Sequence, residues 1–323
     1  MPNYPGISSE AFRHPLDLQA EQTLRSVPGF DLIARKFVEF IYERPQQIYL
    51  LGNSIQVGPR QYATIYGIFR ECLRDLDIYP EPALFISQTP WANAYSLGQD
   101  RPQVILSAGI LDLLTEAEIR TVIAHELGHI KCGHTTLIQM GLWAISAVTF
   151  IGELTLGLGV LFSRGVILAF YEWRRRAELS ADRAALLVTD DLKLVLQTMM
   201  KLAGGSSKYI RECNLDEFIQ QSDQYQELDT DALNQVYKFL LYNGDLNSPI
   251  THPFAVERVR YLQEWAASEE YRQIRQGNYR RAGAEGSVNV AVESPNPEAE
   301  ALRRELEELQ REIERIKSQS RED

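Results

Sequence analysis

Apolar residues recur every three or four positions in the segment that follows Thr115, and this spacing predicts an amphipathic helix with one buried face. Thr115 stands three residues before Glu118, which is the capping-box pattern that marks the start of a helix. The sequence therefore predicts a helix that begins after Thr115 and presents one apolar stripe to a core. The residues of this stripe are Ile119, Val122, Ile123, Leu127 and Ile130.

Strand-like and helical patterns alternate along the rest of the chain, which predicts an α+β fold that is mostly helical with a small mixed or antiparallel sheet. Residues 84–86, 92–97 and 104–107 are predicted as strands. Residues 48–57 are predicted as a hairpin that turns at Gly52-Asn53. Further helices are expected over residues 60–76, 192–203, 215–221, 233–242 and 253–270.

Composition divides the chain into four segments. Residues 1–47 are predicted as an N-terminal helical extension, and residues 48–275 as the main domain. Residues 276–297 are small and polar with Gly and Pro, which indicates a flexible linker. Residues 298–320 are predicted as a C-terminal, coiled-coil-like helix.

The C-terminal helix carries apolar residues at alternating spacings of four and three, the a/d pattern of a coiled coil. Two interpretations remain open. The helix mediates self-association or docks on a partner, or it is a single solvated helix with internal ion pairs. The seam consists of Leu302, Leu306, Leu309, Ile313 and Ile316.

Charge and cysteine content narrow the class of protein. The chain of 323 residues has a net charge of −11, which argues against nucleic acid as a partner. Cys72, Cys132 and Cys213 are widely spaced, and we expect reduced thiols of an intracellular protein instead of a disulfide framework. The first residues have neither a basic region nor an apolar core, so no cleaved secretory signal is expected.

His125, Glu126 and His129 form the segment H-E-L-G-H within the predicted helix. Residues four apart lie nearly one above the other on a helix, so both imidazoles can hold one metal ion. Glu126 lies at the edge of that face and can reach a water on the metal without acting as a ligand. The alternative is an ordinary helix that carries two histidines. Three of the five histidines lie within ten residues, which favours the metal site.

Two histidines leave a catalytic zinc site one protein ligand short. The segment R-R-R-A-E-L-S-A-D-R offers Glu178 as the third ligand, and Asp182 lies four residues later on the same helical face. We expect Asp182 to accept the Nδ1–H of a metal-bound histidine and so to fix its orientation. The alternative is an exposed helical face that carries two carboxylates. The small residues Ala177, Ser180 and Ala181 allow close helix packing and favour the ligand interpretation.

The order of H-E-L-G-H, an apolar stretch, R-R-A-E-L-S-A-D and T-H-P-F resembles the gluzincin metallopeptidases of the HtpX heat-shock protease and CAAX prenyl endopeptidase type. The match is close over residues 103–134 and extends over roughly residues 60–265. The resemblance implies a zincin-like fold in which an apolar helical hairpin is inserted between the two helices that carry the metal ligands.

The same resemblance implies one Zn²⁺ per chain, held by His125, His129 and Glu178. It implies hydrolysis of a peptide bond by a zinc-activated water, with Glu126 as the general base and Asp182 behind a ligand histidine. Zinc lowers the pKa of a bound water to about 7, which suits this chemistry near neutral pH. A protein or peptide is the expected substrate.

His252, in the segment T-H-P-F, is the candidate donor to the oxyanion that forms during hydrolysis. The resemblance places the H-P motif near the active site, whereas by residue type alone a single His before Pro is a turn or cap residue. Arg258 is a second candidate donor or, as we favour, a structural ion-pair partner. His134 is five residues after His129 and off the metal face of an ideal helix, which predicts a structural role.

Asn93, Ala94 and Tyr95 are candidates for substrate binding. They resemble the N-A-F-type strand that precedes the active-site helix in this family. Peptidases of this kind bind substrate as an added strand on a sheet edge, through backbone hydrogen bonds. An ordinary hairpin without a role in binding is the alternative.

Residues 137–170 are strongly apolar and are interrupted by Glu153 and Arg164. Each of the two arms spans about 24 Å as a helix, which is less than the hydrocarbon core of about 30 Å. Because His129 and Glu178 must meet at one metal ion, the chain has to leave and return on the same side. Either a helical hairpin inserts into a membrane, or both arms pack within the protein.

Three arginines at residues 174–176 favour a cytoplasmic base for this hairpin, whereas Arg164 argues against deep insertion. We expect contact of residues 137–170 with membrane lipid and an active site that faces the cytoplasm. A soluble cytoplasmic protein is the alternative.

Two functions of different classes follow from these patterns. The first is a zinc metalloendopeptidase in membrane-associated protein quality control or processing. The second is a non-catalytic, zinc-stabilised protein that tethers partners through the apolar hairpin and the coiled coil. Glu126 favours the peptidase, because a structural metal site does not need a base beside its ligands.

Overall fold

The computed structural model describes residues 3–27, 30, 43–98, 101–142, 158–243 and 250–282. The chain divides into two units, Met1–Arg281 and Ala282–Asp323, and all described residues except Ala282 belong to the first. The predicted C-terminal helix and its a/d seam lie outside the described residues, as does most of the predicted linker. The predicted fold class, α+β and mostly helical with a small sheet, is confirmed.

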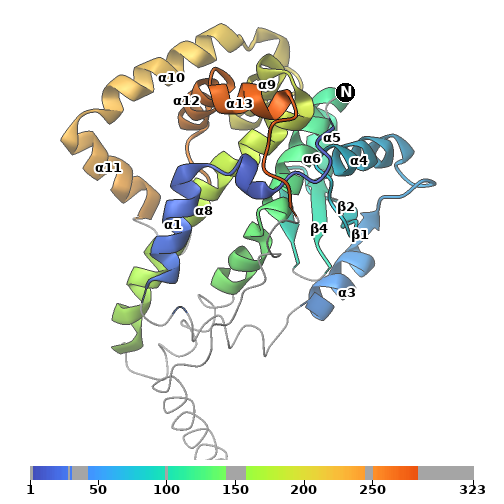
Figure 1. The fold of residues 1–323 in the computed structure, drawn as a ribbon, viewed down its shortest axis with the longest axis horizontal. Helices are drawn as coiled ribbons and strands as arrows, with labels where there is room; N and C mark the ends of the chain where they lie inside the picture. Colours follow the sequence, from blue (N-terminus) through green and yellow to red (C-terminus); the bar gives the residue numbers. More distant parts are fainter. Residues whose placement is uncertain are drawn as a thin grey trace, which may run out of the picture. The chain divides into compact units, whose positions relative to one another are not determined.

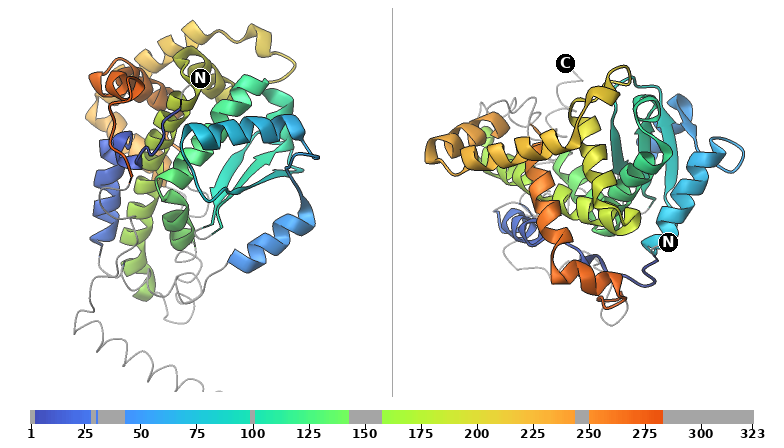
Figure 2. Two further views of the ribbon diagram at one scale, coloured as in Figure 1. Left: turned by 45° about the vertical axis from the view of Figure 1, so that its right-hand side comes forward. Right: turned by 90° about the horizontal axis from the view of Figure 1, so that it is seen from above.

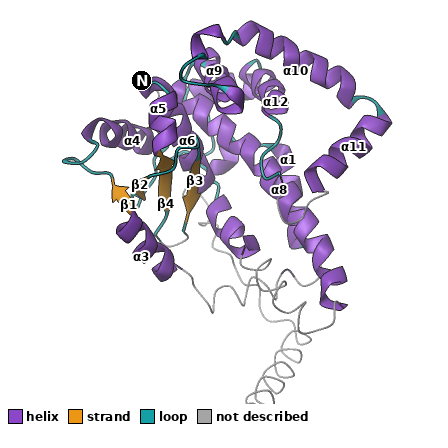
Figure 3. Ribbon diagram, turned by 180° about the vertical axis from the view of Figure 1, so that it is seen from behind, coloured by secondary structure: helices purple, strands orange, loops and turns teal. Residues whose placement is uncertain are grey.

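A four-stranded mixed sheet lies between helix α3 (Glu43–Asn53) and the long helix α8 (Leu158–Thr189) in Figures 1 and 3. Its strands are β1 (Ser54–Gln56), β2 (Ala83–Ser87), β3 (Ala94–Leu97) and β4 (Gln103–Ser107). In the spatial order β1-β2-β4-β3, β2 and β4 are parallel, and the two outer strands pair antiparallel. β3 is an edge strand, and no other described strand pairs with its outer side. The three strands predicted downstream of residue 80 are confirmed.

Most of the predicted helices are present, with shifted ends. The principal helices are α1 (Pro15–Arg25), α3 (Glu43–Asn53), α4 (Ala63–Asp75), α5 (Ala108–Leu113), α6 (Glu116–Lys131), α8 (Leu158–Thr189), α9 (Leu192–Gly204), α10 (Leu215–Asp229), α11 (Ala232–Asn243), α12 (Ala255–Ala266) and α13 (Glu269–Arg275). Helix α10 continues eight residues beyond its predicted end, and the last predicted helix is divided into α12 and α13.

The hairpin predicted at residues 48–57 is wrong. Helix α3 occupies the first part of this segment, and β1 follows it and pairs with β2. Leu50 is buried in one cluster with Phe85 and Ile105 of the sheet. The helix therefore brings one apolar side chain to the sheet, and Gly52 lies within its last turn instead of forming a hairpin turn.

Helices α6 and α8, which carry the predicted metal ligands, pack against each other. The capping box predicted for α6 is present, with Thr115 as the N-cap. A Cβ atom built at Gly128 of α6 would lie 2.6 Å from the Cβ of Ala184 and 3.1 Å from the Cα of Ala181, both on α8. Glycine at this position therefore permits the close approach that brings the two ligand-bearing helices together.

Several described residues at the ends of the predicted apolar hairpin are packed within the protein. Leu137 and Met140, from a helical segment at residues 134–142, are buried with Phe170 of α8. The same cluster contains Leu24 of α1, which lies along α8 (Figure 2). Residues 143–157 lie outside the described part of the chain. Among the described helices, none combines the length and the apolar character that a membrane crossing requires.

Candidate active site

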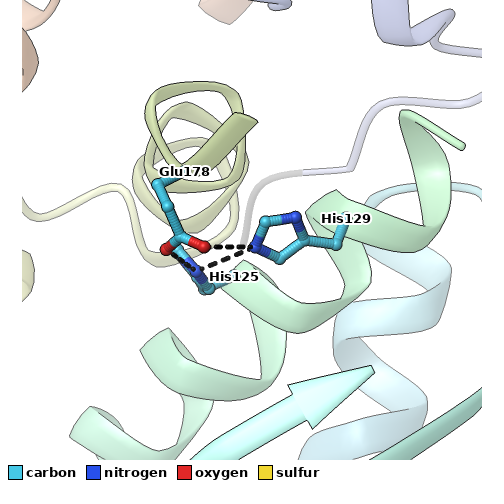
Figure 4. Close-up of side chains that lie close together, drawn as sticks. All are labelled: His125, His129 and Glu178. Carbon is cyan, nitrogen blue, oxygen red and sulfur yellow. Dashed lines mark hydrogen bonds and ion pairs between the residues drawn. The ribbon is translucent and has the colours of Figure 1, made fainter. Parts of the chain in front are cut away.

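The side chains of His125 and His129 on α6 and of Glu178 on α8 converge on one point (Figure 4). The Nε2 atoms of the two histidines are 3.3 Å apart. Oε2 of Glu178 is 3.2 Å from Nε2 of His125, and Oε1 is 3.4 Å from Nε2 of His129. These three groups form the one candidate metal-binding cluster among the described residues.

The geometry of this cluster fits a divalent metal ion. Two donors about 2.0–2.1 Å from a tetrahedral zinc ion are about 3.3 Å apart, which matches the three measured separations. Oε2 of Glu178 is buried, and no described group donates a well-directed hydrogen bond to it, although His125 is near. Two imidazoles and one carboxylate are the donor set of many catalytic zinc sites. The residues present therefore fit the metal that their chemistry implies.

The electrostatics of the cluster are those of a site that holds a cation. Burial alone would lower the pKa of His125, but the hydrogen bond with Asp182 and the nearby carboxylate of Glu178 raise it to about 10. Burial would raise the pKa of Glu178, but the neighbouring His252 and His129 hold it well below its ordinary value.

Asp182 orients His125 and is itself held by α12. Its Oδ1 atom is 3.0 Å from Nδ1 of His125. Arg258 of α12 donates from Nε to Oδ2 at 2.8 Å and from Nη2 to Oδ1 at 2.5 Å. Burial would raise the pKa of Asp182, but Arg258 lowers it below its ordinary value, so the carboxylate is ionised. This arrangement keeps the proton on Nδ1 of His125 and turns Nε2 toward the metal position.

Glu126 lines a cavity of about 280 Å³ together with His125 and Glu178. The residue is only 5 % exposed and is one of the residues that line this cavity. It belongs to α6 but is not part of the three-residue cluster. A base beside the metal position, within the same cavity, is the arrangement that hydrolysis requires.

His252 lies at the same cavity, on the segment before α12. Its Nε2 atom is 3.5 Å from Oε1 of Glu178, and its Nδ1 atom is 2.9 Å from Oγ1 of Thr251. Glu178 acts to raise the pKa of His252, but burial and the charge of Arg258 act together to lower it. The pKa of His252 is therefore below its ordinary value. A ring that accepts at Nδ1 from Thr251 carries its proton on Nε2, the nitrogen that is near Glu178.

Asn93 and Ala94 line the cavity at the start of the edge strand β3, whereas Tyr95 is not among its lining residues. The backbone around Asn93 is held by Ser107, since Asn93 N donates to Ser107 Oγ and Ser107 N donates to Asn93 O, both at 2.9 Å. The structure thus brings two of the three predicted substrate-binding residues to the cavity. Their role in binding stays a prediction.

A second group of residues, which was not predicted from the sequence, lies around His129. Nδ1 of His134 is 3.0 Å from Nδ1 of His129, and Nε2 of His134 is 3.0 Å from Oδ2 of Asp17. His134 does not continue α6, because Gly133 has φ +73 and the chain turns before the next helix begins. A helical projection therefore places this ring wrongly. The useful signals were the clustering of three histidines and the glycine between them.

Comparison with known proteins agrees with this site. The family model described as Peptidase family M48 matches residues 59–266. Plastoglobule-localized metallopeptidase 48, a chloroplastic protein of Arabidopsis thaliana, is 33 % identical over 279 residues, which cover 84 % of this chain and 76 % of that protein. No solved structure gives a significant match.

More distant relatives are named as HtpX proteases. The protease HtpX homolog of Helicobacter acinonychis is 25 % identical over 240 residues, covering 68 % of this chain and 72 % of that protein. The homolog of Moorella thermoacetica is 22 % identical over 261 residues, covering 73 % and 82 %. The predicted resemblance is confirmed: the chain belongs to peptidase family M48, the family of the HtpX-type zinc metallopeptidases, and is a metalloprotease.

Proposed function

We propose that this metalloprotease is a zinc-dependent endopeptidase in which His125, His129 and Glu178 hold the metal and Glu126 is the general base. The convergence of three donor atoms within 4.8 Å of one another carries this proposal. The position of Glu126 in the cavity beside them supports catalysis over a purely structural metal site. A non-catalytic tethering protein would have no use for this base.

Each protein group has a defined task in the proposed reaction. Bound zinc would supply Lewis acidity, which polarises the scissile carbonyl and lowers the pKa of a water molecule to about 7. Glu126 accepts a proton from the attacking water and delivers it to the leaving nitrogen. Asp182 keeps the ring of His125 in the orientation that it has in the structure. His252 donates its Nε2–H to the developing oxyanion.

We place the substrate along the edge strand β3. An extended peptide would pair with the outward-facing backbone groups of β3, which alternate along the strand and include those of Ala94. The cavity is also lined by the apolar residues Val195 and Met199 of α9. The site therefore favours an extended peptide with an apolar side chain next to the cleaved bond.

We further propose that the protein works at a lipid surface, with the active site facing the cytoplasm and residues 137–170 in contact with lipid, apart from the buried Leu137, Met140 and Phe170. The apolar composition of this segment supports the proposal. The name of the Arabidopsis relative places that protein at plastoglobules. Helix α11 also exposes apolar side chains. They are Leu233, Val236, Tyr237, Leu240 and Leu241, each more than half exposed.

Flotation with lipid vesicles tests the lipid contact. A protein that stays at the bottom of the gradient would contradict this proposal and would support the alternative, a soluble protein. Self-association through residues 302–316 is a separate proposal that rests on the a/d seam alone. Sedimentation of the full chain beside a Leu306→Asp variant tests it. A monomer at all concentrations for both proteins would exclude self-association.

The variant Glu126→Gln tests the catalytic role, because it removes the base and keeps the shape of the side chain. We expect it to bind zinc as the unaltered chain does and to lose casein cleavage by a factor of about 10² to 10⁴. Glu116→Gln is the matched control, since Glu116 is an exposed residue in the first turn of the same helix. Equal cleavage by Glu126→Gln and the control would refute the assignment of Glu126.

A further inference from the structure

A buried chain of side chains runs from His129 to the N-terminal helix α1. Nδ1 of His129 is 3.0 Å from Nδ1 of His134, and Nε2 of His134 is 3.0 Å from Oδ2 of Asp17. His134 and Asp17 are fully buried, and His129 is 4 % exposed. The contact joins residues 117 positions apart in the sequence. The chain therefore connects the candidate metal site to a segment far outside the H-E-L-G-H helix.

One arrangement of protons satisfies every contact in this chain when Nε2 of His129 faces a metal. Nδ1–H of His129 then donates to the unprotonated Nδ1 of His134, and Nε2–H of His134 donates to Asp17. His129 is thus oriented by a carboxylate, as His125 is by Asp182. The difference is that the imidazole of His134 lies between His129 and the carboxylate of Asp17.

Asp17 is in turn held by several donors. Ser180 donates from Oγ at 2.7 Å, Trp173 from Nε1 at 3.2 Å and Arg13 from Nε at 2.8 Å. Ser180 and Trp173 belong to α8, the helix that carries Glu178. Burial would raise the pKa of Asp17, but His134 and Arg13 lower it well below its ordinary value, so it remains ionised. The carboxylate therefore fixes α1, α8 and the ring of His134 at one point.

Helix α1 precedes the region that the family model matches, which begins at residue 59. We propose that Asp17 is a positioning residue that acts through His134 to hold His129 toward the metal, so that the N-terminal extension completes the metal site. This inference rests on the proposed function, because it takes His129 as a zinc ligand. Asp17 and His134 touch no substrate in this proposal, and their effect is on zinc affinity.

The test is the zinc dissociation constant of the full chain, measured by competition with a chromophoric chelator. Groups that orient a metal ligand typically change metal affinity by about 10- to 100-fold, so we expect Asp17→Asn to raise the dissociation constant by about 10-fold or more. Glu21→Gln is the matched control. Glu21 also lies on α1 and also pairs with Arg13, but no hydrogen bond joins it to His134. We expect its zinc affinity to stay within about two-fold of the unaltered chain.

Two substitutions of His134 separate positioning from packing. His134→Leu removes both nitrogens, and we expect the same loss of zinc affinity as in Asp17→Asn. His134→Gln offers an oxygen to His129 and an N–H to Asp17, so we expect it to recover part of the affinity. The double variant Asp17→Asn with His134→Leu should be no weaker than His134→Leu alone, because both changes break one chain.

The outcomes distinguish this inference from the proposed function. If the unaltered chain binds no zinc, or if His129→Ala binds it equally well, the proposed metal site fails. If the unaltered chain binds zinc and Asp17→Asn and His134→Leu bind it as tightly, only the positioning role is overturned. Thermal unfolding in chelator shows whether each variant folds. Should Asp17→Asn not fold, the affinity of His134→Leu decides the question alone.

Discussion

Arg258 donates two hydrogen bonds to the carboxylate of Asp182, at 2.8 and 2.5 Å, and the same carboxylate contacts Nδ1 of His125. The pair links α12 to the metal-binding face of α6 by way of α8. The sequence predicts Arg258 as either an oxyanion donor or an ion-pair partner. Both of its hydrogen bonds go to a carboxylate, as expected for an ion-pair partner. It also lines the cavity, so its charge contributes to the field there.

Removal of this guanidinium should loosen His125. We expect Arg258→Ala to weaken zinc binding and to lower kcat/KM by about 10- to 100-fold, because Asp182 is left buried without its cation and no longer fixes the ring. Equilibrium zinc titration and peptide cleavage measure both effects. Arg260→Ala, on the same helix and paired with Glu264, is the control and should change neither quantity.

Removal of the metal should destabilise the folded chain, because zinc binds the three converged ligands and not the unfolded chain. At a free zinc concentration 100 times the dissociation constant, the stabilisation is about 2.7 kcal/mol. We therefore expect a chelator to lower Tm and zinc to restore it. His129→Ala should show no zinc-dependent change in Tm. A Tm that does not respond to zinc in the unaltered chain would contradict the metal assignment.

Acid should weaken the attachment of α1 through His14, the N-cap of that helix, whose Nδ1 accepts from Leu16 N at 3.1 Å. Burial and the nearby charge of Arg183 lower the pKa of His14 to about 4, from an ordinary value near 6.5. Between these values the unfolded chain binds more protons than the folded chain. The contribution of His14 is therefore intact above pH 6.5 and is lost as the pH falls toward 4, by up to about 1.4 kcal/mol per pH unit.

Urea unfolding between pH 4 and 7 measures this dependence. His14→Asn keeps a good N-cap residue that does not titrate, so its free energy of unfolding should fall less steeply with acid. The difference between the two chains isolates His14 from the carboxylates, which titrate in both. Parallel curves for the two chains would show that His14 is not responsible.

The approach of α6 to α8 should tolerate no side chain at Gly128. We expect Gly128→Ala to cost about 1 to 3 kcal/mol, because the added methyl group would overlap Ala184, and to weaken zinc binding by moving Glu178 away from the histidines. Gly67→Ala in α4 is the matched control, since a Cβ there would have no atom within 4 Å. Glycine to alanine in a helix otherwise stabilises by up to about 1 kcal/mol. Equal stability of the two variants would contradict the packing argument.

Features that depend on neighbouring residues were predicted correctly from the sequence. The start of α6 at Thr115 and the shared face of His125 and His129 follow from a capping box and a four-residue spacing, both of which are local. The resemblance of the whole motif order identified the family. The hairpin predicted at residues 48–57 was wrong, because a short apolar run fits a helix as well as a strand until the surface that it packs against is known.

The sequence by itself determined the helix and the shared face of His125 and His129, because the geometry of an α-helix is the same in every fold. Only the tertiary structure decided which groups contact the Nδ1 atoms of these histidines. Asp17 reaches His134 across 117 positions, and Arg258 reaches Asp182 across 76. No local periodicity encodes such contacts, since they arise from the packing of α1 and α12 against α8. The orientation of the ligands is therefore a property of the folded core.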